Sequence, residues 1–176
     1  YFAGLVERIG DDRLRIMLYH IPQVAGVGIP TDVAARLRTE FPEQVVGLKD
    51  SSGDWATTEA FLDIDGLTVW PGAELPLLDA LDRGSPGCIT ATANVNPGPV
   101  VEVIRQYGEG GREAAVDAME RARAYRLALQ GQPAIPTMKR LLALRHDDTT
   151  WAIVRPPFVE MDEAEGRTLM DRLAAI

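Results

Sequence analysis

The chain has 176 residues, of which 46% are hydrophobic, and its formal net charge is −8. This composition is typical of a globular protein with a core and excludes a disordered chain. The sequence shows neither the basic cluster of a nucleic-acid-binding surface nor an apolar run of the roughly 18 residues that cross a membrane. We therefore expect a cytoplasmic protein that binds neither nucleic acid nor a membrane.

The basic residues are unevenly divided between the two types. Lysine occurs only at Lys49 and Lys139, and the other 16 basic residues are arginines. Because arginine supplies almost all of the surface cations, a lysine inside an apolar strand calls for a chemical explanation. An amine can lose its proton and attack a carbonyl group, whereas a guanidinium effectively cannot. The single cysteine, Cys88, excludes an internal disulfide framework, and we expect it to be buried.

The first part of the chain alternates predicted strands with predicted helices. Short apolar runs bounded by turn residues predict buried strands, and a loop rich in Pro and Gly over 20–30 precedes a helix that Thr31 is expected to cap. The predicted order is a helix end at 2–9, strand 14–19, helix 31–41, strand 44–49, helix 54–63, strand 67–70, helix 74–82, strand 87–90 and helix 97–107. This rhythm predicts βαβ units and a parallel sheet.

The last part of the chain predicts helices alone, at 112–129, 135–144 and 162–175. The segment TTWAIVRPPFVEM between the last two contains prolines, which argue against a central strand. We therefore expect two parts, residues 1–109 with the strand–helix units and residues 110–176 as a helical extension.

Two α/β architectures fit four strand–helix units, a doubly wound sheet and a (β/α)8 TIM barrel. A doubly wound sheet favours a glycine-rich phosphate loop, and no loop here contains GxGxxG or GxxxxGK[ST]. Instead, Tyr19, Lys49, Gly72 and Thr90 end or follow the four strands, and barrels build their active sites at those ends. These positions favour a barrel, of which four strands form only part.

Lys49 and Tyr19 are the candidate catalytic residues. Burial at the end of the strand VVGLK disfavours the ammonium form of Lys49, and the neutral amine could form an imine with a keto group. Tyr19 on the neighbouring strand could then relay protons. The alternatives are a lysine that extends to the surface and a tyrosine at the rim with its hydroxyl in water.

Two motifs carry a family resemblance. LYHIP, followed 30 residues after its tyrosine by the lysine of VVGLKDSSGD, resembles the dihydrodipicolinate synthase / N-acetylneuraminate lyase family. The later segments TATANVNP, PAIPTMKRLL and VRPPF resemble the family's eighth strand and its C-terminal helical region. The resemblance covers almost the whole chain in the same order.

The resemblance implies a (β/α)8 TIM barrel of which residues 1–109 supply the second half, strands five to eight. It implies imine formation at Lys49, proton relay at Tyr19, no cofactor, no metal, and a homo-oligomer such as a tetramer. With only two histidines, a zinc-dependent aldolase is not expected either. The residues that would bind substrate are Ser51, Gly72, Glu74, Ile89 and Thr90.

Two departures from the family pattern bear on the substrate. His20 stands where the family has asparagine. Val24 stands where dihydrodipicolinate synthases have an arginine that binds a second carboxylate, and the family's carboxylate-binding loop would lie before Tyr1. We therefore expect a class I lyase or aldolase for another 2-keto acid of the pyruvate type. The alternative is a non-catalytic or truncated family member that acts as a binding or assembly module.

Overall fold

The computed structural model describes residues 1–176, which form two compact units, residues 1–89 and residues 90–176. None of its helices combines the length and the apolar character that a membrane span requires.

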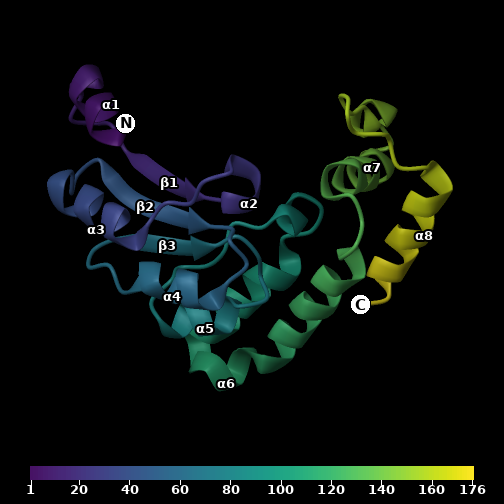
Figure 1. The fold of residues 1–176 in the computed structure, drawn as a ribbon. Helices are drawn as coiled ribbons and strands as arrows, with labels where there is room; N and C mark the ends of the chain where they lie inside the picture. Colours follow the sequence, from purple (N-terminus) through teal and green to yellow (C-terminus); the bar gives the residue numbers. More distant parts are fainter. The chain divides into compact units, whose positions relative to one another are not determined.

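The first unit is built on a parallel sheet of three strands in the order β1, β2, β3 (Figure 1). Helical crossovers join the strands, as parallel pairing requires. The strands are β1 (Ile16–His20), β2 (Val45–Asp50) and β3 (Thr68–Pro71), and the helices are α1 (Phe2–Ile9), α2 (Pro22–Ala25), α3 (Thr31–Glu40), α4 (Trp55–Leu62) and α5 (Leu77–Asp82).

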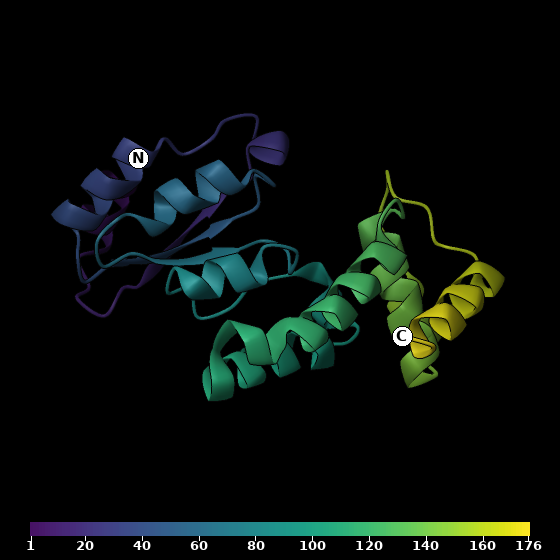
Figure 2. The ribbon, with the colours of Figure 1, turned by 90° about the horizontal axis from the view of Figure 1, so that it is seen from below.

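The two faces of this sheet have different surroundings. Leu18, Leu48 and Val69 are at most 1% exposed and form the core with side chains of α3 and α4, which include Phe61. Both helices lie on this side of the sheet (Figures 1 and 2). On the opposite face, Met17 is 46% exposed. The period of two along each strand therefore separates a packed face from an open one.

The predicted helix starts agree with the structure only in part. The helix predicted to begin at Asp54 does so, since the Asp54 carboxylate caps α4 by accepting a hydrogen bond from the Ala56 N–H. Thr31 does not cap α3, because it is already the first helical residue and Pro30 occupies the capping position. Helix α5 begins at Leu77 rather than Glu74, because the ring of Pro76 disfavours helical geometry in the residue before it. The short helix α2 lies within the segment predicted as a loop.

The predicted strand at 87–90 is absent, and this prediction was wrong. Only the Ile89 N–H reaches β3, where it donates to the Pro71 carbonyl. Pro71 has no backbone N–H, so it cannot donate a second hydrogen bond to the segment 87–90. Earlier in the same segment, the Ser85 hydroxyl donates a hydrogen bond to the Val69 carbonyl of β3 at 2.7 Å. Groups of β3 that would form a ladder with a fourth strand are therefore occupied or missing.

The second unit is helical throughout. Its helices are η1 (Ala91–Asn94), α6 (Gly98–Leu129), α7 (Ala134–His146), η2 (Thr149–Ala152) and α8 (Glu163–Ala174). Leu141, Leu169 and Leu173 pack with the C-terminal part of α6 in its core. The predicted helices 97–107 and 112–129 meet within α6 at Gly111, whose φ of 73° is not helical. The predicted division at 109/110 lies next to this break and stays a prediction about the domains.

Candidate active site

The register of the sheet brings three side chains to one face near the carboxyl ends of the strands. Tyr19 on β1 pairs with Lys49 on β2, which in turn pairs with Trp70 on β3. Residues that pair directly in a sheet point to the same side. All three therefore lie on the open face, opposite the core under α3 and α4.

Lys49 and Tyr19 are in direct contact. The Lys49 Nζ lies 3.2 Å from the Tyr19 Oη and 4.4 Å from the centroid of its ring. The pKa of the Tyr19 phenol is held below its usual range, first by the Ser51 hydroxyl and then by Lys49, both of which stabilise the phenolate, while burial opposes them. The geometry thus joins an amine to a phenol that gives up its proton more readily than usual.

Ser51 is held in place by its neighbours on three sides. Its N–H donates to the His20 carbonyl at 2.8 Å, and its own carbonyl accepts from the Gln23 side chain at 2.6 Å. A Cβ built on Gly72 would lie 2.1 Å from the Ser51 Oγ, so only glycine fits there. Gln23 belongs to α2, which lies beside the C-terminal tip of β1 (Figure 1). The unpredicted helix α2 therefore supports the residue that tunes Tyr19.

Asp50 fixes the loop that follows Lys49, a role that the sequence alone did not reveal. The side chain is 2% exposed and accepts hydrogen bonds from the Ser52 N–H at 2.9 Å, the Ser52 hydroxyl at 3.0 Å and the Thr58 hydroxyl. These bonds tie the loop to α4. The signal in the sequence is the acid–hydroxyl cluster DSSGD over 50–54.

His20 also has a structural role that the sequence analysis missed. Its ring is 7% exposed, stacks edge-on against Phe61 with centroids 5.1 Å apart, and accepts the Ile29 N–H at its Nδ1. A Cβ on Gly28 would come within 2.9 Å of the ring. His20 therefore anchors the loop between β1 and α3 from the packed side of the sheet.

The remaining candidate residues have more varied positions. Gly72 follows β3 and donates its N–H to the Asp50 carbonyl at 2.6 Å, while Ile89 is 37% exposed. Glu74 is only 1% exposed, and its charge adds to the burial that raises the pKa of Cys88 to about 12. Thr90 belongs to the second unit, where its hydroxyl lies 3.1 Å from that of Thr92. The structure thus brings Tyr19, Lys49, Ser51 and Gly72 to one edge of the sheet.

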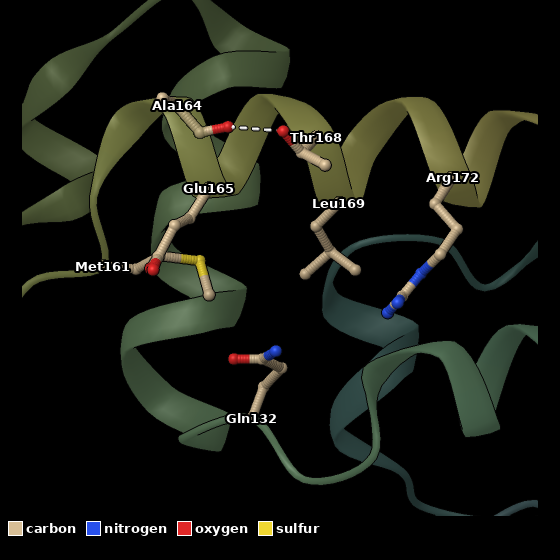
Figure 3. Close-up of a pocket in the computed structure, with 7 residues that line it drawn as sticks. All are labelled: Gln132, Met161, Ala164, Glu165, Thr168, Leu169 and Arg172. Carbon is tan, nitrogen blue, oxygen red and sulfur yellow. Dashed lines mark hydrogen bonds between the residues drawn. The ribbon is translucent and has the colours of Figure 1, made fainter.

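The second unit contains a pocket of about 470 Å³ formed around α8 (Figure 3). The Thr168 hydroxyl in its wall donates to the Ala164 carbonyl of the same helix, a bond within the helix itself. Its lining residues are Gln132, Met161, Ala164, Glu165, Thr168, Leu169 and Arg172. These residues include no lysine, so the pocket does not compete with Lys49 as a site for imine formation.

Comparison with known proteins identifies related sequences over almost the whole chain. The Dihydrodipicolinate synthetase family matches residues 4–176. A protein of Chloroflexus aurantiacus named an uncharacterized DapA-like lyase is 33% identical over 178 aligned residues, which cover 99% of this chain and 58% of that protein. The chain therefore spans a little over half the length of this relative.

Solved structures give the same picture of the fold. Dihydrodipicolinate synthase from Agrobacterium tumefaciens is 29% identical with a TM-score of 0.75, covering 99% of this chain and 58% of its own. YagE of E. coli K12, a prophage protein of the dihydrodipicolinic acid synthase family solved with pyruvate, is 21% identical with a TM-score of 0.84, covering 99% and 59%. The predicted fold class is confirmed: the chain carries part of a (β/α)8 TIM barrel together with C-terminal helices.

Proposed function

This chain belongs to the Dihydrodipicolinate synthetase family, and we propose that it carries the imine-forming residues of a lyase or aldolase for a 2-keto acid of the pyruvate type. The proposal rests chiefly on the 3.2 Å contact between the Lys49 Nζ and the Tyr19 Oη on adjacent strands. The pyruvate bound to the structural neighbour YagE supports this kind of substrate.

The proposed chemistry uses each of the two side chains for a separate task. The neutral amine of Lys49 attacks the C2 carbonyl, and the carbinolamine loses water after a proton from Tyr19 reaches its oxygen. The protonated imine withdraws electrons from C3. Either a C3 proton then leaves to give an enamine, or, in a 4-hydroxy-2-keto acid, the C4 hydroxyl loses its proton as the C3–C4 bond breaks, which releases an aldehyde and leaves the same enamine. The enamine then takes up a proton at C3 and becomes the imine again. Hydrolysis of the imine returns the keto acid and the free amine.

We propose that Ser51, Gly72, Ile89 and Thr90 contact the substrate, with Ser51 acting from its fixed place beside Tyr19. Glu74 enters the proposal in a different way. Because its side chain is 1% exposed, contact with a ligand would require the loop from Gly72 to Pro76 to move. A variant at Glu74 should therefore affect the stability of this loop as well as ligand binding.

The substrate class is narrowed by Val24, which is 75% exposed beside the candidate site on α2. An exposed isopropyl group cannot form the paired hydrogen bonds by which a guanidinium holds a carboxylate. We therefore propose a substrate whose distal end is not a carboxylate, in contrast to the dicarboxylic semialdehyde of dihydrodipicolinate synthesis. We also propose a cytoplasmic homo-oligomer, such as a tetramer, for the whole protein.

Trapping of the imine tests this function in the full-length protein. Incubation with pyruvate and borohydride should add the mass of a reduced pyruvyl group to the peptide that contains Lys49. Lys49→Arg should abolish the adduct, because arginine keeps its cation but forms no imine. Lys139→Arg removes the other lysine of this chain and is the matched control, which should be labelled as in the wild type.

The same assay separates the enzyme from a non-catalytic family member. An enzyme should both form the adduct and exchange the methyl protons of pyruvate in D2O, which proton NMR detects without any aldehyde partner. Binding of pyruvate with neither adduct nor exchange would support a binding or assembly module. Labelling that persists in Lys49→Arg would remove Lys49 from its proposed role.

A further inference from the structure

Trp70 occupies an unusual place on the open face of the sheet. It pairs with Lys49, yet its ring reaches back along β2 to Gly47. A Cβ on Gly47 would lie 2.6 Å from the Trp70 Cζ3 and 3.3 Å from its Cη2. The benzene part of the indole therefore occupies the space that a side chain at position 47 would fill, and Gly47 is buried.

This arrangement places the indole on the amino-terminal side of Lys49. Gly47 precedes Lys49 by two residues on the same face, which corresponds to about 7 Å along a strand. The partner of Gly47 on β1 is Met17, which shares that face. Met17 and the indole of Trp70 thus form an apolar surface below Lys49, while the polar groups of Tyr19 and Ser51 lie toward the carboxyl edge.

We propose that Trp70 is a specificity-determining residue that closes the floor of the imine site and selects keto acids without a branch at C3. The inference rests on the proposed function of Lys49. In the adduct, the carboxylate and the departing oxygen are polar and belong on the side of Tyr19, so C3 is the atom that faces apolar surface. A new bond to C3 forms toward the open edge. A further methyl group on C3 would meet the indole.

Branching of the keto acid at C3 provides the test. The full-length protein is incubated with equal concentrations of pyruvate or 3-methyl-2-oxobutanoate and reduced with borohydride, and the adducts on Lys49 are quantified by mass spectrometry. Because one methylene group against a packed wall changes selectivity by at least about tenfold, we expect a preference of that order for pyruvate. Trp70→Leu should reduce the preference at least about tenfold, and Trp70→Phe should reduce it less.

Trp55→Phe is the matched control, because Trp55 begins α4 and does not contact Gly47 in the way that Trp70 does. It should leave the ratio of the two adducts unchanged. A second readout uses a protein with Trp55 and Trp151 both changed to phenylalanine, in which Trp70 is the only tryptophan of this chain. Pyruvate should change its fluorescence, and Lys49→Arg in the same background should remove most of that change.

The outcomes distinguish this inference from the function on which it depends. Adducts that form with an unchanged ratio in Trp70→Leu and Trp70→Phe would overturn the role of Trp70 and leave the imine chemistry intact. If Trp70→Leu does not fold, the ratio in Trp70→Phe and the fluorescence response decide the matter. The absence of adducts with either keto acid in the wild type would overturn the proposed function, and this inference with it.

Discussion

The two faces of the three-stranded sheet carry different information although their residues alternate along the same strands. Leu18, Leu48 and Val69 are packed beneath helices and are at most 1% exposed. The next residue on each strand is Tyr19, Lys49 or Trp70, and these three pair across the open face. On each strand, a residue that stabilises the fold is thus followed directly by one that can carry chemistry.

The packed face also controls the geometry of the open one. Asp50 and His20 point away from Lys49, yet their hydrogen bonds hold the loops that follow β2 and β1. Ser51 lies on the first of these loops and donates its N–H to the His20 carbonyl. The position of the hydroxyl beside Tyr19 therefore depends on groups that a substrate need not touch.

Substitution of the adjacent residues Leu48 and Lys49 should separate the contribution of the packed face to stability from that of the open face to chemistry. Leu48→Ala removes a fully buried side chain and should lower the free energy of unfolding by about 2–5 kcal/mol. At about 2–4 °C per kcal/mol for a chain of this length, that corresponds to a fall in Tm of roughly 4–20 °C. Thermal unfolding followed by circular dichroism measures it.

Lys49→Ala is the control for Leu48→Ala, since it lies one residue later on the open face. It should change Tm by no more than about 2–4 °C, the effect of 1 kcal/mol at this chain length, while removing the borohydride adduct. If Leu48→Ala and Lys49→Ala lowered Tm equally, the division of the sheet into a packed and an open face would be wrong.

The elements of the fold that the sequence predicts best are those whose signals are local. The strand 44–49 and the helix that Asp54 caps appear within one or two residues of their predicted bounds. The predicted strand at 87–90 failed because its ladder depends on partners elsewhere in the chain. The Ser85 hydroxyl already donates to one carbonyl of β3. Pro71, whose carbonyl accepts from the Ile89 N–H, has no N–H to donate a second ladder hydrogen bond.

The residues of the candidate site were likewise predictable only where their signals are local. Lys49 stood out because lysine is rare in this chain, and Tyr19 through the motif around it. The role of Trp70 could not be read from the sequence, because an aromatic residue in an apolar strand predicts core packing on either face. Only the pairing of Trp70 with Lys49 and the ring over Gly47 show which face it occupies. Contacts between distant segments therefore define the part of the site that local patterns leave open.

Tyr19→Phe tests the open face more finely than Lys49→Ala. The variant keeps the ring over which the Lys49 Nζ lies but removes the Oη at 3.2 Å. Loss of a general acid–base group should slow exchange of the pyruvate methyl protons by about 10²-fold or more. The borohydride adduct should still form on longer incubation. Exchange within twofold of the wild-type rate would mean that Tyr19 carries no proton in the reaction.

The smallest effect is expected from Ser51→Ala, and its sign follows from the Tyr19 pKa. The Ser51 hydroxyl is the main group that lowers this pKa, so its removal should raise the pKa toward the usual range for a phenol. If protonated Tyr19 is the donor, activity falls as the pH rises through that pKa. The alkaline limb of the exchange profile should therefore move to higher pH in Ser51→Ala, with only a few-fold loss of rate at neutral pH.

Absorbance at 295 nm follows ionisation of the phenol directly, and subtraction of the Tyr19→Phe titration isolates Tyr19 from the other tyrosines. Ser52→Ala is the matched control, because the Ser52 hydroxyl bonds to Asp50. Because that bond also helps to hold the loop on which Ser51 lies, Ser52→Ala should move the Tyr19 titration by less than Ser51→Ala does. A limb that moves to lower pH in Ser51→Ala would mean that the Ser51 hydroxyl does not lower the Tyr19 pKa. An equal movement in Ser52→Ala would mean that the whole loop, rather than the one hydroxyl, tunes Tyr19.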